Sequence, residues 1–155
     1  MFDIFGDFNS YEELNKTAEG LKAEGDLNNI KVLAKENGLD ESVAEMFASG
    51  ECEVLVDAFG AAMGKLLVEK REIKNKNMPV DPIVDYLLSE SLEDEFAMKI
   101  RLTEKKLSEC IKQVEEKCRK ECQEKKVNYI PDMIVYEWAK GYYEKEGVGD
   151  EQKGA

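Results

Sequence analysis

The chain has 155 residues, among them 34 acidic and 22 basic side chains, which give a formal net charge of −12. Its length suits one domain or two small ones with a real hydrophobic core. Apolar residues make up 43%, an ordinary share for a globular protein, whereas the charged share of 36% is high. The acidic excess argues against binding nucleic acid through a broad basic surface and favours a basic partner.

No run of about 18 apolar residues occurs, so we expect no membrane-spanning helix. The first residues, MFDIFGDF, lack the basic and apolar profile of a signal peptide, and we therefore expect a cytoplasmic location. In that compartment the four cysteines are expected to be reduced thiols. They are Cys52, Cys110, Cys118 and Cys122.

Catalysis is not expected from this composition. The chain contains no histidine, which removes Ser-His and Cys-His nucleophile pairs and His-ligated metals. Paired carboxylates can act as acid and base, but with 34 acidic residues such pairs arise by chance. The cysteines lack the tight spacing of a structural zinc site. We therefore expect no enzyme activity, no catalytic residue, no cofactor and no metal.

Three short helices are predicted between residues 10 and 50. A capping box opens the first, which runs from about Tyr11 to Lys22, and an aspartate caps each of the other two. The capping residues are Ser10, Asp26 and Asp40. Gly38 and Gly50 end the second and third helices. Together they form a compact helical module.

A fourth helix is predicted from about residue 51 to 74. Gly60 and Gly64, four residues apart, give it a face of small residues that permits close approach of another helix. Each glycine lowers the stability of the helix by about 1 kcal/mol relative to alanine. Two interpretations follow: tight packing inside the molecule, or a helix-mediated homodimer. Residues 70–79 then lose the apolar period, and Pro79 and Pro82 forbid a continuing helix. We place a module boundary there.

The C-terminal part predicts a helical bundle. Asp81 caps a helix that continues to about Ile100, and a break follows at residues 101–105. The next helix, from about 106 to 123, carries one stripe of apolar and thiol side chains, which indicates burial. This stripe is Leu107, Ile111, Val114, Cys118 and Cys122. The last helix starts after Pro131 and ends before Gly147, and residues 148–155 form a polar tail that we expect to be disordered.

The predicted fold is therefore all-α, with a small acidic N-terminal helical module over residues 1–76 and a C-terminal helical bundle module over residues 80–147. The acidity is concentrated in the first part. Residues 1–60 hold 14 acidic and 4 basic side chains, a net charge of −10. This asymmetry indicates either an acidic surface that imitates nucleic-acid phosphates in a basic groove, or a face that only keeps the module soluble.

The last helix carries the only tryptophan and three of the six tyrosines of the chain. Its Trp138 shares a predicted core face, and we expect this ring to pack against the helices between residues 83 and 122. That face consists of Val135, Trp138, Ala139 and Tyr142. Tyr136 and Tyr143 lie off this stripe and are predicted as secondary partner-binding residues, since amphipathic rings contribute contact area at low entropic cost.

Three stretches resemble a known family. YIPDMIVYEWAKGYYEKEG, VDYLLSESLEDEFAMKI and KKLSECIKQV are similar in order and rough spacing to the helices of PcfK-like proteins. This family is encoded on conjugative elements and phages of Gram-positive bacteria, and it includes anti-CRISPR proteins. The resemblance covers about residues 80–147. Lys140 and Gly141 depart from it, because relatives often carry an apolar residue and a histidine there.

The positions that match the family pattern are Tyr86, Leu87, Glu93, Asp94, Phe96, Ala97, Lys106, Cys110, Ile111, Trp138, Ala139, Tyr142 and Tyr143. The resemblance implies a non-enzymatic inhibitor of the type II CRISPR effector nuclease or its guide-RNA complex, acting in the cytoplasm of a bacterial host cell. Such a nuclease holds nucleic acid in a positive channel, so we expect the acidic module to act as a nucleic-acid mimic. Its predicted partner-binding cluster is Glu12, Glu13, Glu19, Glu24, Asp26, Glu36, Asp40, Glu41 and Glu45.

Two other functions stay open. One is an accessory or structural interaction protein of a conjugative element, with the glycine face supporting homo-oligomers. The other is a nucleic-acid-binding regulator, which the net charge opposes. Its basic strip would be Lys65, Lys70, Arg71, Lys74 and Lys76.

Overall fold

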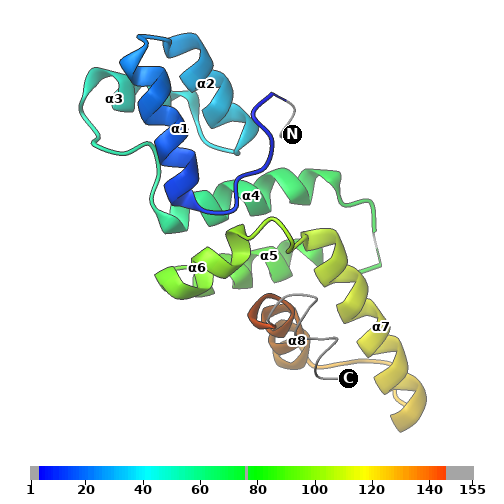
Figure 1. Cartoon of the computed structure of the whole chain (residues 1–155). Coiled ribbons are helices and arrows are strands. Elements are labelled where there is room, and N and C mark those ends of the chain that lie inside the picture. The colour runs from blue at the N-terminus through cyan, green and yellow to red at the C-terminus, as the bar shows by residue number, and fades with distance from the viewer. Residues whose placement is uncertain (1–3, 76, 146–155) are drawn as a thin grey trace.

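The computed structural model describes residues 4–75 and 77–145, so the tail predicted at 148–155 lies outside the described residues. Eight α-helices and no strand occupy the described ranges, which confirms the all-α fold. In chain order they are α1 (Tyr11–Ala23), α2 (Leu27–Glu36), α3 (Glu41–Ser49), α4 (Ala58–Glu72), α5 (Val80–Glu90), α6 (Asp94–Arg101), α7 (Leu107–Lys125) and α8 (Asp132–Glu144). Figure 1 shows α1, α2 and α3 together at one end and α7 and α8 at the other.

The predicted helix caps of the N-terminal part are confirmed. The side chains of Ser10, Asp26 and Asp40 each accept a backbone N–H from two or three residues further on, at 2.9 to 3.1 Å. These bonds satisfy donors that the first helical turn leaves without a partner. Gly50 ends α3 in the left-handed region at φ +89°. Local sequence signals therefore determine where these helices begin and end.

The fourth helix begins later than predicted. It starts at Ala58 and not near residue 51, and the carboxylate of Asp57 caps it by accepting the N–H of Gly60 at 2.7 Å. The preceding segment is held by the buried Asn15 amide of α1. Its oxygen accepts the backbone N–H groups of Leu55 and Val56, and its nitrogen donates to the Val56 carbonyl. A long-range side chain thus satisfies backbone groups that the prediction had assigned to a helix.

The single helix predicted from Asp81 to Ile100 is in fact two. Helix α5 already begins at Val80, and a turn separates it from α6. Leu87 and Phe96 are nine residues apart, about two and a half turns, so one straight helix would point them in opposite directions. The turn lets both side chains enter the same hydrophobic cluster. The break predicted at residues 101–105 is confirmed, since α6 ends at Arg101 and α7 begins at Leu107.

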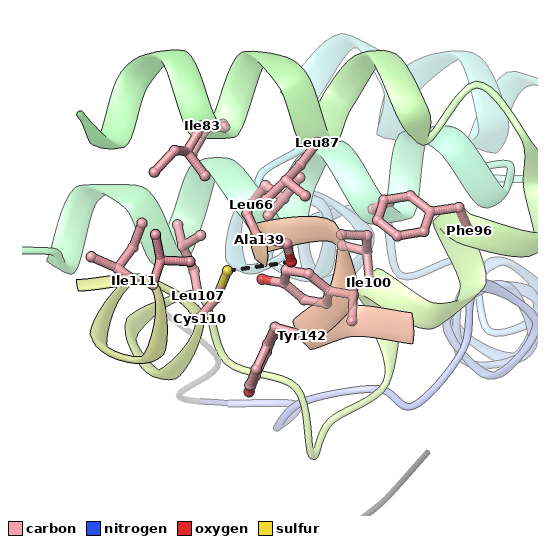
Figure 2. Close-up of a cluster of buried hydrophobic side chains, with 14 of the residues drawn as sticks. Leu66, Ile83, Leu87, Phe96, Ile100, Leu107, Cys110, Ile111, Ala139 and Tyr142 are labelled. Carbon is pink, nitrogen blue, oxygen red and sulfur yellow. Dashed lines mark hydrogen bonds between the residues drawn. The ribbon is translucent and has the colours of Figure 1, made fainter. Parts of the chain in front are cut away.

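Two hydrophobic clusters form the interior. The larger one draws on α4, α5, α6, α7 and α8, and Figure 2 shows its side chains converging around the buried Cys110, whose thiol donates to the Ala139 carbonyl. The smaller one is built by α1, α2, α3 and the start of α4. Because α4 contributes Ala62 and Leu66 to the larger cluster and Ala61 to the smaller one, it belongs to both. The division into residues 1–76 and 80–147 stays a prediction.

A fully buried guanidinium joins the two parts of the chain. Arg101, at the end of α6, is 1% exposed. It donates to Asn37 Oδ1 at 2.6 Å, to the Phe8 carbonyl at 3.0 Å, to Asp7 Oδ1 at 3.3 Å and to the Ala61 carbonyl at 3.4 Å. These acceptors come from the N-terminal segment, the end of α2 and the first turn of α4. One side chain therefore connects four segments that are far apart in the sequence.

A second buried cation, Lys65, lies on α4. Its ammonium group donates to the carbonyls of Ile100, Leu102 and Lys105 at 2.5 to 3.0 Å, which satisfies acceptors where α6 ends. Burial lowers the pKa of Lys65 to about 8, and the nearby Glu69 carboxylate opposes this shift. Because the group is 1% exposed, Lys65 is not part of a surface strip, and that part of the nucleic-acid hypothesis is wrong.

The small face of α4 packs inside the molecule. A Cβ on Gly64 would lie 1.9 Å from the carbonyl oxygen of Asn37, which leaves no room for any side chain. Across this contact, Gly38 follows α2 at φ +72°, and a Cβ there would lie 2.3 Å from the Gly64 carbonyl oxygen. The intramolecular interpretation is therefore correct for Gly64, and its side of the helix is not open to a second copy.

Replacing Gly64 tests this backbone contact. We expect Gly64→Ala to lower the free energy of unfolding by at least about 2 kcal/mol, because a rigid backbone carbonyl occupies the Cβ position. The control is Gly20→Ala, also inside a helix, where a Cβ meets nothing within 4 Å. That variant should raise the free energy of unfolding by up to about 1 kcal/mol. Urea denaturation measures both, and equal stabilities would contradict the proposed contact.

Removing the buried guanidinium should be more severe. We expect Arg101→Met to cost about 3–5 kcal/mol, because it leaves buried carbonyl oxygens without their donor and removes one of the two cationic partners of the Asp7 carboxylate. Arg71→Met, at an exposed position near the end of α4, should cost less than about 1 kcal/mol. Thermal and chemical unfolding would measure the difference. Similar small losses in both variants would show that Arg101 does not join the segments.

Candidate acidic partner-binding surface

Most of the acids predicted to bind a partner lie on the outside of α1, α2, α3 and their connections. Seven of the nine are exposed. They are Glu12, Glu13, Glu19, Glu24, Asp40, Glu41 and Glu45. Asp26 is half-buried and Glu36 is buried. The structure therefore brings most of the set to the surface of one end of the molecule.

Several of these carboxylates have structural partners. Asp26 and Asp40 cap helices, and the N–H and hydroxyl of Ser42 lower the pKa of the Asp40 carboxyl. Glu13 accepts the N–H of Asn9 at 2.9 Å, completing the capping box one residue earlier than the standard pattern. These groups stabilise the helix starts that position the other acids of the set.

The Glu45 carboxylate has a basic neighbour, the ammonium of Lys31 at 3.3 Å. Because Glu45 is 60% exposed, the pair adds little stability and is readily screened by salt. Lys31 and Lys35 are the bases of α2, and the exposed Lys16 and Lys22 lie on α1. The acidic end therefore also carries four basic side chains.

Four carboxylates are exposed and make no hydrogen bond or ion pair within the described part of the chain. We call this set the acidic face, and it consists of Glu12, Glu19, Glu24 and Glu41. Glu12 and Glu19 are seven residues apart, about two helical turns, so both lie on one side of α1, away from the buried Leu14 and Ala18. The acidic face therefore presents negative charge to solvent that the fold itself does not use.

Glu36 does not belong to this face. It is 8% exposed at the end of α2, and its carboxylate accepts the backbone N–H groups of Ile4 and Phe5 at 3.0 to 3.1 Å. The prediction placed this carboxylate in the partner-binding cluster. The structure instead uses this carboxylate to hold the N-terminal segment against α2.

The two secondary tyrosines differ in their exposure. Tyr143 is 1% exposed and packs edge-on against Phe96 and Tyr142, so its predicted role in partner binding is wrong. Helix α8 contacts α5, α6 and α7. The side of α8 that carries Tyr143 faces these helices. Tyr136 is half-buried and stacks on Tyr86 with ring centroids 4.9 Å apart. One face of its ring is therefore already occupied.

A groove between the end of α7 and the start of α8 was missed by the sequence reasoning. It has a volume of about 450 Å³ and includes Trp138, which packs against the larger hydrophobic cluster as expected but is only partly buried. We call it the α7–α8 groove, lined by Glu121, Lys125, Val127, Tyr129, Ile130, Pro131, Ile134 and Trp138. The only sequence signal for this groove is the group of apolar residues around Pro131. Their spacing does not predict whether they are buried or line an open hollow.

The described residues contain no group of three or more His, Cys, Asp or Glu side chains that could hold a metal ion, and none of the helices there is long and apolar enough to cross a membrane. Burial raises the pKa of the Cys110 thiol to about 12, so it is not a nucleophile at neutral pH. The arrangement instead offers two surfaces, one acidic and one apolar.

Comparisons of the chain with protein-family models, with curated proteins and with solved structures find no match.

The structural role of Glu36 separates it from the acidic face. We expect Glu36→Gln to lower the free energy of unfolding by about 1–3 kcal/mol, because an amide accepts the two N–H groups less strongly than a carboxylate and places a donor against one of them. The matched variant Glu19→Gln, exposed and without a partner, should change stability by less than about 0.5 kcal/mol. Denaturation midpoints would measure both, and equal values would contradict the assignment.

Proposed function

We propose that this protein is an anti-CRISPR protein of a phage or mobile element, which binds the type II RNA-guided effector nuclease or its guide-RNA complex through the acidic face. Inhibition is by occlusion of the nucleic-acid-binding surface and involves no chemistry. The observation that carries the proposal is that Glu12, Glu19, Glu24 and Glu41 are exposed and make no hydrogen bond or ion pair within the described residues.

The physical argument is complementarity of charge. An effector nuclease of this type holds its heteroduplex in a positively charged channel and reads its geometry and phosphates, not its sequence. Residues 1–60 carry a net charge of −10. Carboxylates that have no partner within the fold lose no internal bond when they meet lysine or arginine. Binding of this kind is fast and weakens with salt, because ions screen exposed charges within about 8–10 Å.

The C-terminal part supports the proposal in a different way. Its resemblance to PcfK-like proteins covers about residues 80–147, and several matching positions are core residues here, among them Leu87, Phe96, Ala97 and Cys110. The matched pattern is therefore one of packing, not of a binding site. We infer that α5 to α8 serve as the scaffold, and that Arg101 and Lys65 fix α4 to it.

A second candidate is an accessory interaction protein of a conjugative element. The α7–α8 groove favours it, because a hollow lined mostly by apolar side chains, with Tyr129 69% exposed in its wall, is more typical of a protein contact than of a free surface. In this alternative the acidic face only keeps the chain soluble. Neutralising it would then leave the activity of the protein unchanged.

Charge neutralisation tests the proposed function. The purified chain is added to an effector nuclease before or after guide loading, and target-DNA cleavage is measured. We expect the quadruple variant Glu12→Gln, Glu19→Gln, Glu24→Gln and Glu41→Gln to raise the concentration for half inhibition at least about tenfold, since each lost contact with a basic partner contributes about 0.5–1 kcal/mol. Inhibition by the unaltered chain should also weaken as salt rises.

The control carries four neutralised acids on the C-terminal part, all exposed and without an ion pair within the described residues. They are Asp85→Gln, Glu93→Gln, Glu95→Gln and Glu116→Gln. It has the same net charge as the first variant, so an equal loss of inhibition would mean that overall charge, and not the acidic face, is responsible. Full inhibition by the first variant would show that the face does not bind the nuclease.

A further inference from the structure

Two thiols lie on the same face of the second half of α7. Cys118 and Cys122 are four residues apart in this helix, a spacing that places their Cβ atoms about 5–6 Å from each other. Both are free and half-buried, whereas Cys110 is buried in the core. Burial raises the pKa of the Cys118 thiol and the charge of Cys122 raises it further, which places the two sulfurs within electrostatic reach of each other.

The second half of α7 has few contacts with the interior. The buried side chains of this helix all lie at or before Val114. Beyond that point Cys118 packs partly against the larger cluster, and Cys122 does not belong to it. A ligand can therefore reach both thiols from solvent. A bond between them would also hold together helical turns that have few buried contacts of their own.

The number of available ligands determines which metal fits the pair. Within residues 4–75 and 77–145, no three or more His, Cys, Asp or Glu side chains form a group that could hold a metal ion. Structural zinc sites use four ligands, so this pair does not suit Zn²⁺. Soft thiolates select Cu(I), a monovalent cation that two sulfurs can bind without further donors. The cysteine spacing that argues against zinc is no obstacle to such a cation.

Charged neighbours of both signs surround the pair. Arg119 and Lys125 lie three residues before and three residues after Cys122, so they are its neighbours on the helix surface. The Glu115 carboxylate acts on Cys118 from the opposite direction, since it raises the pKa of that thiol. Positive and negative neighbours thus oppose each other, and the two sulfurs themselves determine the affinity for a cation.

We propose that Cys118 and Cys122 form a two-coordinate binding site for Cu(I) on the second half of α7. Each thiol gives its proton to solvent, and two Cu–S bonds form without any change in the oxidation state of copper or sulfur. The bound cation joins two successive turns and so stabilises this part of the helix. The site is separate from the acidic face, and the inference does not depend on inhibition of a nuclease.

Competition with a coloured chelator tests this proposal. The reduced full chain is titrated, without oxygen, into the Cu(I) complex of bicinchoninate, whose absorbance falls as copper is withdrawn. We expect one Cu(I) for each chain, bound more weakly as the pH falls because the thiol protons must leave. Peptide mass spectrometry after treatment with N-ethylmaleimide should show Cys118 and Cys122 modified in the free chain and protected in the copper complex.

Serine variants provide the matched comparison. Cys118→Ser and Cys122→Ser should each lower the affinity for Cu(I) at least about tenfold, the loss that changing even a hydrogen-bond partner of a metal ligand causes. Cys52→Ser should bind copper as the unaltered chain does, because Cys52 lies in the segment before α4. Circular dichroism should show the same helical fold in all three variants.

Three results with copper would overturn the proposal. They are a chain that withdraws no copper from the chelator, normal binding by both Cys118→Ser and Cys122→Ser, and loss of binding in Cys52→Ser alone. Zn²⁺ is titrated in parallel as the competing metal. Tighter binding of Zn²⁺ than of Cu(I) would mean that more than two ligands are involved, and would also overturn the two-coordinate assignment.

Discussion

The buried Arg101 guanidinium is the interaction on which the arrangement of the chain depends. A guanidinium offers five N–H donors in a fixed plane, and here they reach acceptors from the N-terminal segment, the end of α2 and the first turn of α4. Removing such a group from water is costly unless its donors are satisfied. The four segments therefore have to meet in one geometry. Packing of Gly38 against Gly64 beside it brings the backbones close enough for this to happen.

Local signals predicted much of the fold. Capping residues such as Ser10 and Asp40 act on neighbouring N–H groups, so their effect can be inferred from a few adjacent positions. The start of α4 could not be inferred in this way, because Asn15 acts on a segment about forty residues away. The division of α5 from α6 could not be inferred from local signals either, because only the packing of both helices into one hydrophobic cluster requires it. Length and periodicity were sufficient for α7 and α8, which have the expected bounds to within about two residues.

Charged residues were the main source of error. Glu36, Lys65 and Arg101 are all buried, although most side chains of these types lie at the surface. Each satisfies backbone or side-chain groups contributed by distant segments, and this pairing is invisible in a single sequence. The candidate acidic face was predicted more successfully, since exposure is the default for a carboxylate. The α7–α8 groove was not predicted, because apolar residues near Pro131 carry no period that separates a core from an open hollow.

The ammonium of Lys65 has a further consequence for how the chain can be divided. It serves as a cap for the end of α6, although it is supplied by α4 and lies about 35 residues earlier. A polypeptide starting at residue 80 would retain α5 to α8 but lose the donor for three carbonyls and the Leu66 side chain from the core. Such a fragment would not be self-sufficient. Any exchange of this bundle between proteins, in recombination or in engineering, would have to carry α4 with it.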